Sequence, residues 1–189
     1  MIIKQTIKMK RLQLLSVLCL FTLMVFALTG CKKNNDNTNN GSNNGGGSST
    51  EEYVDLGLTS GTKWKTTNEI DDRSTYYTHE RALSKFGNNL PTKEHFLELI
   101  QECEWVWQES GCYKVTGPNG KSFYLQADGA IDCEGNIINP GEQGFYWSRT
   151  SMSNSDWAYA FQLDGDFGYY DIFHTQSCNK YSVRLISEL

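Results

Sequence analysis

The chain has 189 residues, of which 13% are aromatic and 21% charged, and its formal net charge at pH 7 is −5. Nucleic acids and anionic lipid surfaces are bound through basic patches, so this acidic balance argues against both. We therefore expect no nucleic-acid partner. The length fits one folded domain with flanking segments.

The first thirty residues have the pattern of a secretory signal. Lys4, Lys8, Lys10 and Arg11 precede an apolar run from Leu14 to Leu28, which is the order of charged and apolar regions in such signals. This run is shorter than the ~20 apolar residues that a helix needs to cross a bilayer. We predict a cleaved signal peptide over residues 1–30. Its removal leaves 13 basic and 22 acidic residues, or a charge of −9.

The signal ends in Leu28-Thr29-Gly30-Cys31, which resembles the lipobox of bacterial lipoproteins. The resemblance implies that Cys31 becomes the first residue and carries a thioether-linked diacylglycerol and an N-acyl chain such as palmitate. Together these chains exceed the two hydrophobic signals that stable anchoring needs. The expected location is the outer membrane, where the periplasmic and cell-surface faces both stay open.

Residues 32–50, KKNNDNTNNGSNNGGGSST, contain no aromatic or aliphatic side chain. Nothing in this stretch can offset the entropy lost on ordering the backbone. A coil of this composition has a root-mean-square span of roughly 25 Å. We predict that Cys31 and this linker, residues 31–50, hold a single domain, residues 51–189, clear of the membrane.

The domain is predicted to open with a hairpin and two helices. The segments 54–56 and 62–65 flank a glycine-containing turn. A first helix is expected over 78–86, and a second begins after Thr92, a good N-cap. The buried face of the second helix is predicted from its helical spacing to hold Phe96, Leu99, Ile100 and Cys103.

From Trp105 onward the apolar pattern changes to a period of two, which is typical of strands. Turn residues separate the expected strands, and the stretch 127–144 is predicted to be a long irregular loop. Besides the opening hairpin, strands are expected over residues 113–116, 122–126, 145–147, 157–163, 167–173 and 181–186. Helices early and strands late predict an α+β fold, with two helices packed on a mainly antiparallel sheet and long loops.

The domain holds Cys103, Cys112, Cys133 and Cys178. In an oxidising compartment an even number of cysteines predicts disulfides. Four cysteines allow three connectivities, and spacing alone does not choose among them. Zinc is the alternative, but no Cys-x-x-Cys pair or nearby histidine favours it.

Several motifs occur together in one order across most of residues 53–187. They are VDLGL with SGTKW (54–64), LPT (90–92), YKVTGPNG (113–120), YWS (146–148) and SVRL (182–185). In this combination they resemble the Fibrobacter succinogenes major paralogous domain family. That family is similar to C-type lectin-like folds, including the C-terminal domain of a Legionella collagen-like adhesin and the formylglycine-generating enzymes.

The resemblance implies a C-type lectin-like mixed fold in which the chain ends pair in one sheet beneath a long loop region. It implies no activity, because fold alone does not deliver function. With the lectin-like arrangement, Cys133 and Cys178 lie on the same side of the sheet. We therefore expect the bridges Cys133–Cys178 and Cys103–Cys112. In the second, the residues between the two cysteines are expected to fold back as a hairpin and bring them together.

No catalytic constellation is recognisable in the sequence. His79, His95 and His174 stand far apart and outside any metal or triad motif, so we expect surface or capping roles for them. Ser148 is not followed by the glycine of a nucleophile elbow. The paired, metal-bound cysteines of the formylglycine-generating enzymes have no counterpart, and we expect no catalytic residue and no enzyme activity.

Calcium is the metal that a lectin-like loop would carry, on six to eight oxygen ligands. Asp156, Asp164, Asp166 and Asp171 cluster in the sequence. However, Asp164-Gly165-Asp166 is also what a hairpin turn needs, and the lectin sugar-binding triplets Glu-Pro-Asn and Trp-Asn-Asp are absent. We favour the turn and expect no metal and no cofactor.

A sugar ring stacks on an exposed aromatic side chain, so aromatic residues outside the buried pattern of their strands are candidates for ligand binding. Tyr146 and Tyr170 are expected to point away from the buried side of their strands. They are the predicted ligand-binding residues. Arg184, between two apolar residues of the last strand, is expected to form an ion pair or a backbone tether.

These observations predict a lipid-anchored recognition module that binds a glycan or another surface polymer without catalysis. Two alternatives stay open. The first is a structural or adhesive subunit of an envelope assembly, and the second is an enzyme acting on a glycan.

Overall fold

The structure is a computed structural model that describes residues 52–72, 74–153 and 156–188. The predicted signal peptide, the predicted linker and the predicted lipidation site Cys31 lie outside these residues. Among the described helices, none has the length and apolar character needed to cross a bilayer.

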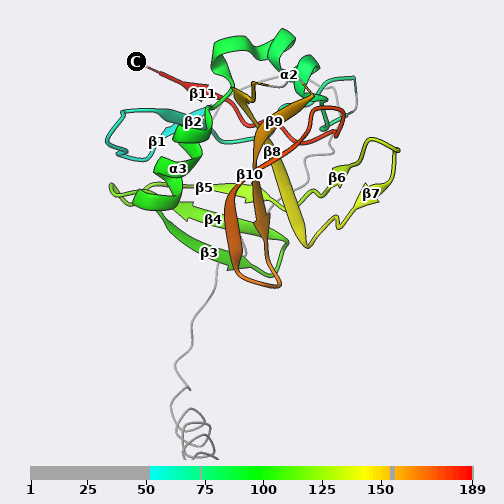
Figure 1. Cartoon of the computed structure of the whole chain (residues 1–189). Helices are drawn as coiled ribbons and strands as arrows, with labels where there is room; N and C mark the ends of the chain where they lie inside the picture. Colours follow the sequence, from blue (N-terminus) through cyan, green and yellow to red (C-terminus); the bar gives the residue numbers. More distant parts are fainter. Residues whose placement is uncertain (1–51, 73, 154–155, 189) are drawn as a thin grey trace, which may run out of the picture. The chain divides into compact units, whose positions relative to one another are not determined.

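The described domain is α+β, with few helices and mostly antiparallel strands (Figure 1). The helical elements are α2 (His79–Phe86), the short 3-10 helix η1 (Gly87–Asn89) and α3 (Lys93–Glu102). The strands are β1 (Tyr53–Asp55), β2 (Lys63–Lys65), β3 (Glu104–Gln108), β4 (Cys112–Thr116), β5 (Ser122–Gln126), β6 (Ala130–Ile131), β7 (Ile137–Ile138), β8 (Gln143–Ser151), β9 (Trp157–Asp164), β10 (Tyr169–Gln176) and β11 (Ile186–Ser187).

Both helices begin where their capping residues predict. The Thr78 hydroxyl accepts a hydrogen bond from the Arg81 backbone N–H at 3.3 Å. Thr92 caps α3 in a capping box, in which the His95 ring nitrogen Nδ1 accepts from the Thr92 backbone N–H at 3.0 Å. The capping role expected for His95 is confirmed, whereas His79 is buried and not on the surface.

The first and last described strands belong to one sheet, in the order β1-β2-β11. Trp64 of β2 pairs with Val54 of β1 on one side and with Ile186 of β11 on the other. These three side chains are buried together in the first of two apolar clusters. The last strand is shorter than predicted, because the chain from Tyr181 to Ser182 makes only isolated bridges.

A second sheet has the order β3-β4-β5, and β4 and β5 flank the predicted turn. Gly117 in this turn approaches the first hairpin closely, since a Cβ atom there would lie 2.2 Å from the Leu56 carbonyl oxygen. The contact places the β4–β5 turn directly against the segment that follows β1.

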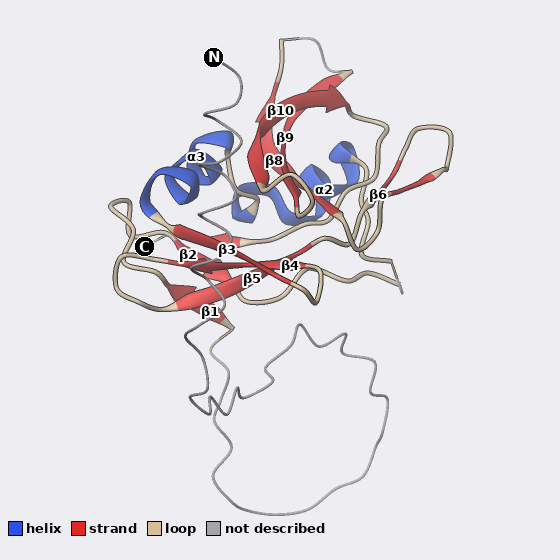
Figure 2. Cartoon of the chain, turned by 90° about the horizontal axis from the view of Figure 1, so that it is seen from below, coloured by secondary structure: helices blue, strands red, loops and turns tan. Residues whose placement is uncertain are grey.

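The central sheet, β10-β9-β8, is covered on both faces. Phe161 and Leu163 of β9 point into the first apolar cluster, while Ala158 and Ala160 point into a second one. Figure 2 shows this sheet standing over the layer of β3, β4 and β5, with α3 beside it. Each strand of the sheet therefore contributes alternate residues to two different cores.

The stretch predicted as a long loop contains the short β6–β7 ribbon. Ile131 of β6 exchanges backbone hydrogen bonds with Lys180, at 3.0 and 2.7 Å. Next to this bridge, Cys133 and Cys178 form a disulfide with a Cα–Cα distance of 5.1 Å. The predicted Cys133–Cys178 bridge is thus present.

The predicted Cys103–Cys112 bridge is wrong, because Cys103 is a free cysteine. Between these two positions, residues 104–108 form β3 and residues 109–111 form the turn into β4. Glu104 pairs with Thr116 and Gln108 pairs with Cys112, so the two cysteines sit at opposite ends of the β3–β4 hairpin. At about 3.3 Å per residue, the length of β3 puts them far beyond disulfide reach.

Candidate functional site

The structure rules out Tyr146 as an exposed ligand-binding ring. Its side chain is 0% exposed, and its hydroxyl donates to the Gln126 carbonyl oxygen at 2.8 Å. Burial raises its pKa to about 12. The prediction assumed one buried face per strand, and it is wrong because residues 144–148 of β8 are buried on both faces of the sheet.

Tyr170 is half-buried and packs against two other aromatic rings. Its ring stacks on Trp105, with 4.4 Å between ring centroids and 14° between planes, and its edge meets Tyr113. The contact with Trp105 occupies one ring face, so the ring packs against the first apolar cluster. The two residues predicted to bind the ligand are therefore not brought together at a surface site.

Ser148, His79 and Asp164, which the sequence offered as candidates for catalysis or metal binding, make contacts that stabilise the fold. Ser148 is buried, and its carbonyl oxygen lies 3.0 Å from Nε2 of His79, which donates to it in the matching tautomer. Burial lowers the pKa of His79. The Asp164 carboxylate accepts from the backbone N–H groups of Asp166 and Phe167, which is the predicted turn role.

Arg184 is fully buried and is a backbone tether, as expected. Its guanidinium donates to the carbonyl oxygens of Lys65 and Tyr124, each at 2.9 Å. It also donates to the side-chain oxygens of Asn68 and Gln126 at 2.9 and 2.7 Å. These four bonds tie β2, the loop at Asn68 and β5 to the segment that leads into β11, and they leave no part of the guanidinium facing a ligand.

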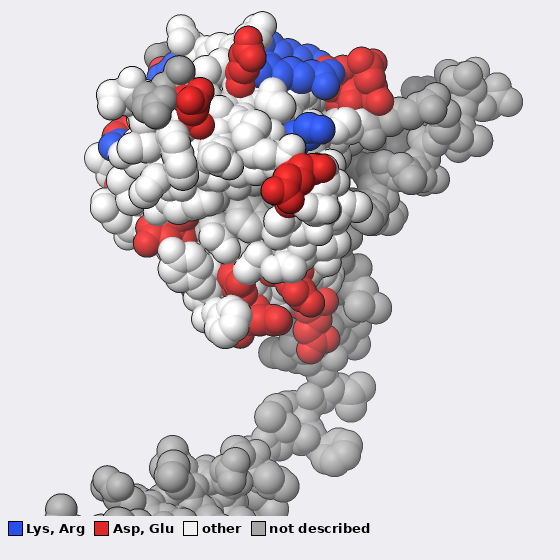
Figure 3. Space-filling model, turned by 45° about the vertical axis from the view of Figure 1, so that its right-hand side comes forward, with Lys and Arg blue, Asp and Glu red and all other residues white. Residues whose placement is uncertain are grey.

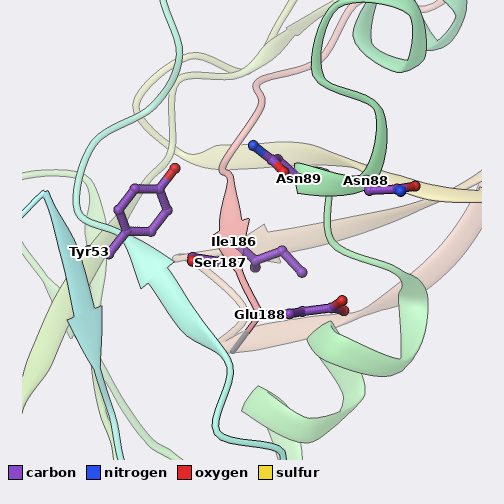
Figure 4. A pocket seen from close by; sticks show the side chains of 6 residues that line it. All are labelled: Tyr53, Asn88, Asn89, Ile186, Ser187 and Glu188. Atoms are coloured by element: carbon purple, nitrogen blue, oxygen red, sulfur yellow. The ribbon is translucent and has the colours of Figure 1, made fainter.

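A surface hollow lies at the β1-β2-β11 sheet (Figure 4). It has a volume of about 410 Å³ and is lined by Tyr53, Asn88, Asn89, Ile186, Ser187 and Glu188. Figure 4 shows the Tyr53 ring on one side, the two asparagines on the other, and β11 between them. Pockets of several hundred Å³ are of the size that binds small organic ligands.

A second hollow of about 420 Å³ shares Tyr53 and Ser187 with the first. Its other lining residues are Asp55, Lys63 and Lys121. Neither of these lysines forms an ion pair with another described residue. Together the two adjoining hollows have nine different lining residues, and we call them the Tyr53 hollow.

The chemistry of the Tyr53 hollow is mixed. The Asn88 side-chain oxygen accepts from Arg149 at 3.0 Å, which leaves its amide N–H groups to face a ligand. Asn89 makes no side-chain hydrogen bond within the part of the chain that is described. Glu188 lies 3.2 Å from His95. Burial raises the pKa of Tyr53, although Lys65 opposes the shift, so its hydroxyl is protonated at neutral pH and able to donate.

The sequence carries a local signal for the exposure of Tyr53. Val54 is buried, and strand alternation then turns Tyr53 and Asp55 to the opposite face. Asn88 and Asn89 closely follow the first predicted helix in the sequence. Their position next to β11 depends on the fold and could not be inferred from local pattern.

No metal centre is formed by the residues that the structure describes, since no three His, Cys, Asp or Glu side chains come together in one group. Comparisons of the chain with protein-family models, curated proteins and solved structures find no match. The function is therefore inferred from the geometry of the Tyr53 hollow.

Proposed function

We propose that this protein is a lipid-anchored recognition module of the cell envelope that binds a glycan without catalysis. The Tyr53 hollow is the observation that carries the proposal. It combines one aromatic ring with hydroxyl, amide, carboxylate and ammonium groups. Sugars present C–H faces to aromatic rings and hydroxyl groups that both donate and accept, so this lining suits a saccharide.

The two lysines narrow the class of saccharide. Lys63 and Lys121 belong to the second hollow, where Asp55 is the one acidic lining residue. The Asp55 carboxylate already accepts from the Gly57 backbone N–H at 2.8 Å. Two ammonium groups against one occupied carboxylate favour a sugar that bears an acidic group, such as a uronic acid or a sulfated residue.

We further propose a C-type lectin-like fold for the domain. The sheet that joins β1, β2 and β11 supports this assignment, because it brings the two ends of the domain together. The position of α3 directly after Leu90-Pro91-Thr92 also supports it. Within such a fold, the Tyr53 hollow lies on the terminal sheet and not on the long loops.

A glycan array probed with the full chain in non-ionic detergent tests the binding function. The proposal predicts retention of acidic saccharides and no change in their length or composition after prolonged incubation. Turnover of any saccharide would show an enzyme instead. Capture of a single envelope protein, with no saccharide retained, would show a structural or adhesive subunit.

Membrane attachment needs its own test, because it rests on the lipobox-like sequence. Replacing Cys31 with serine removes the sulfur that would carry the diacylglycerol. We expect the Cys31→Ser protein to lose lipid labelling and to leave the outer-membrane fraction. Full attachment of the variant after normal signal cleavage would contradict the anchor.

A further inference from the structure

The turn between β9 and β10 carries two aromatic rings into solvent. Phe167 is 85% exposed and Tyr169 is 46% exposed. Phe167 is the most exposed large apolar side chain among the described residues. Covering such a ring is favourable because it removes apolar surface from water. We call the segment 164–169 the aromatic tip.

The aromatic tip is held in place by its own contacts. The Asp164 carboxylate accepts from the backbone N–H groups of Asp166 and Phe167 at 3.0 and 3.1 Å. The side-chain amide of Gln143 donates to the same carboxylate. On the other side, the Trp107 ring packs so tightly against Gly165 that a Cβ atom there would lie 2.1 Å from it. A turn fixed in this way loses little freedom when it binds.

Carboxylates surround the two exposed rings. Asp166 lies within the tip, and Asp171 is exposed on β10 two residues after Tyr169. Glu142 is exposed beside the tip, since its carbonyl oxygen accepts from the Gly165 N–H at 2.9 Å. In Figure 3 the end of the domain that carries this turn shows acidic and uncharged side chains, while Lys and Arg lie elsewhere on that face.

We propose that the aromatic tip docks a basic segment of a partner protein, which sets an apolar side chain against Phe167 and Tyr169 and lysines or arginines against the surrounding carboxylates. The exposed rings supply the apolar contact, and the carboxylates select the charge of the partner. A membrane surface fits less well, because anionic headgroups are repelled by the same carboxylates. The tip and β11 lie at opposite ends of the domain in Figure 1, so the Tyr53 hollow stays accessible.

The probe is a nine-residue peptide in which one leucine is flanked by four lysines and by glycines at both ends. One control peptide has serine in place of leucine, and another has glutamate in place of lysine. Binding to the full chain in non-ionic detergent is measured by fluorescence anisotropy. We expect the lysine–leucine peptide to bind at least about tenfold more tightly than either control, and to weaken as salt rises from about 50 to about 500 mM.

Protein variants locate the binding. Phe167→Ser is expected to weaken binding of the lysine–leucine peptide by about tenfold, and Asp166→Asn to weaken it by about threefold. Ile137→Ser is the matched control, because Ile137 is another exposed apolar residue, 69% exposed on β7 and outside the tip. Its variant should bind like the natural protein. All variants carry exposed substitutions, and thermal unfolding verifies that each is folded.

The proposal is overturned if the natural protein binds all three peptides equally, or if Phe167→Ser and Ile137→Ser weaken binding to the same extent. It is also overturned if no peptide binds while neutral phosphatidylcholine vesicles do so in a Phe167-dependent manner. That result would make the tip a membrane contact. Saccharide binding at the Tyr53 hollow is unaffected by either outcome.

Discussion

The Nη2 group of Arg184 donates to the Tyr124 carbonyl oxygen at 2.9 Å. Tyr124 belongs to β5, the strand at one edge of the β3-β4-β5 sheet. The bond closes this edge with a side chain from the segment that leads into β11. Tyr146 acts in the same way, because its hydroxyl donates to the Gln126 carbonyl oxygen of the same strand.

Removal of the Arg184 guanidinium should therefore strongly destabilise the domain. Arg184→Met fills much of the volume but removes the donors to the part-buried carbonyl oxygens of Lys65 and Tyr124, which should cost about 1–3 kcal/mol each. We expect the free energy of unfolding to fall by about 3 kcal/mol or more. Urea unfolding followed by tryptophan fluorescence measures it.

The control for this change is Arg149→Met. Arg149 is only partly buried and donates to Asn88 at the surface, so its loss should cost about 1 kcal/mol or less. Equal destabilisation by the two variants would mean that Arg184 is not the tether described here.

The Cys133–Cys178 disulfide should contribute strongly to stability. It closes a loop with a sequence separation of 45 residues, which is worth roughly 4 kcal/mol in the chain-entropy model. The Cys133→Ser/Cys178→Ser double variant is expected to lose stability of that order in urea unfolding.

Cys103→Ser is the matched cysteine change. Cys103 is half-buried with no disulfide, and burial raises the pKa of its thiol to about 11. We expect Cys103→Ser to lower the free energy of unfolding by under about 1 kcal/mol. A non-reducing peptide map that linked Cys103 to Cys112 would contradict the strand register of β3 and β4.

Stability should fall in mildly acidic solution because of His79. Burial lowers its pKa below the ordinary value of 6.5, so the unfolded chain takes up a proton before the folded domain does. The contribution of neutral His79 is therefore complete above about pH 6.5 and is lost as pH falls toward its folded-state pKa. Burial lowers the pKa of His95 as well, so it adds to the same trend.

The measurement is the midpoint temperature of unfolding between about pH 7.5 and 5, for the natural protein and for His79→Gln. Glutamine does not titrate and keeps a side-chain amide that can donate to the Ser148 carbonyl oxygen. The variant should show a shallower decline below pH 6.5. An identical decline in both proteins would assign the pH dependence to other groups.

Lys63 and Lys121 are expected to select acidic saccharides. The Lys63→Gln/Lys121→Gln variant keeps the hollow but removes both ammonium groups. It should bind an acidic saccharide about tenfold more weakly and its neutral counterpart with unchanged affinity. Equal weakening for both saccharides would indicate a change of shape and not a loss of charge recognition.

Local sequence signals predicted the local structure well. Thr78 and Thr92 marked the helix starts, because an N-cap hydroxyl satisfies a backbone N–H within three residues. The turns at Gly117 and Asp164 were predicted from the turn-forming residues in their sequences. Each of these features depends on neighbours a few residues away, so local sequence is sufficient.

The candidate site was not predictable in this way. Tyr146 was expected to be exposed, but β8 has an apolar cluster on each face and its residues 144–148 are all buried. Cys103 and Cys112 were expected to meet, but the strand pairing of β3 with β4 separates them. The Tyr53 hollow joins residues about 135 positions apart, and only tertiary packing brings them together.

The most direct test of saccharide binding at the Tyr53 hollow is to fill the hollow without disturbing the core. Ser187 is exposed and lines both parts of the hollow, so Ser187→Trp should block it, while Ser84→Trp places the same ring at an exposed position on α2 outside it. Isothermal titration with the saccharide retained most strongly on the array is the measurement. Our account predicts that Ser187→Trp abolishes binding and that Ser84→Trp leaves it unchanged. Full affinity in a folded Ser187→Trp protein would contradict it.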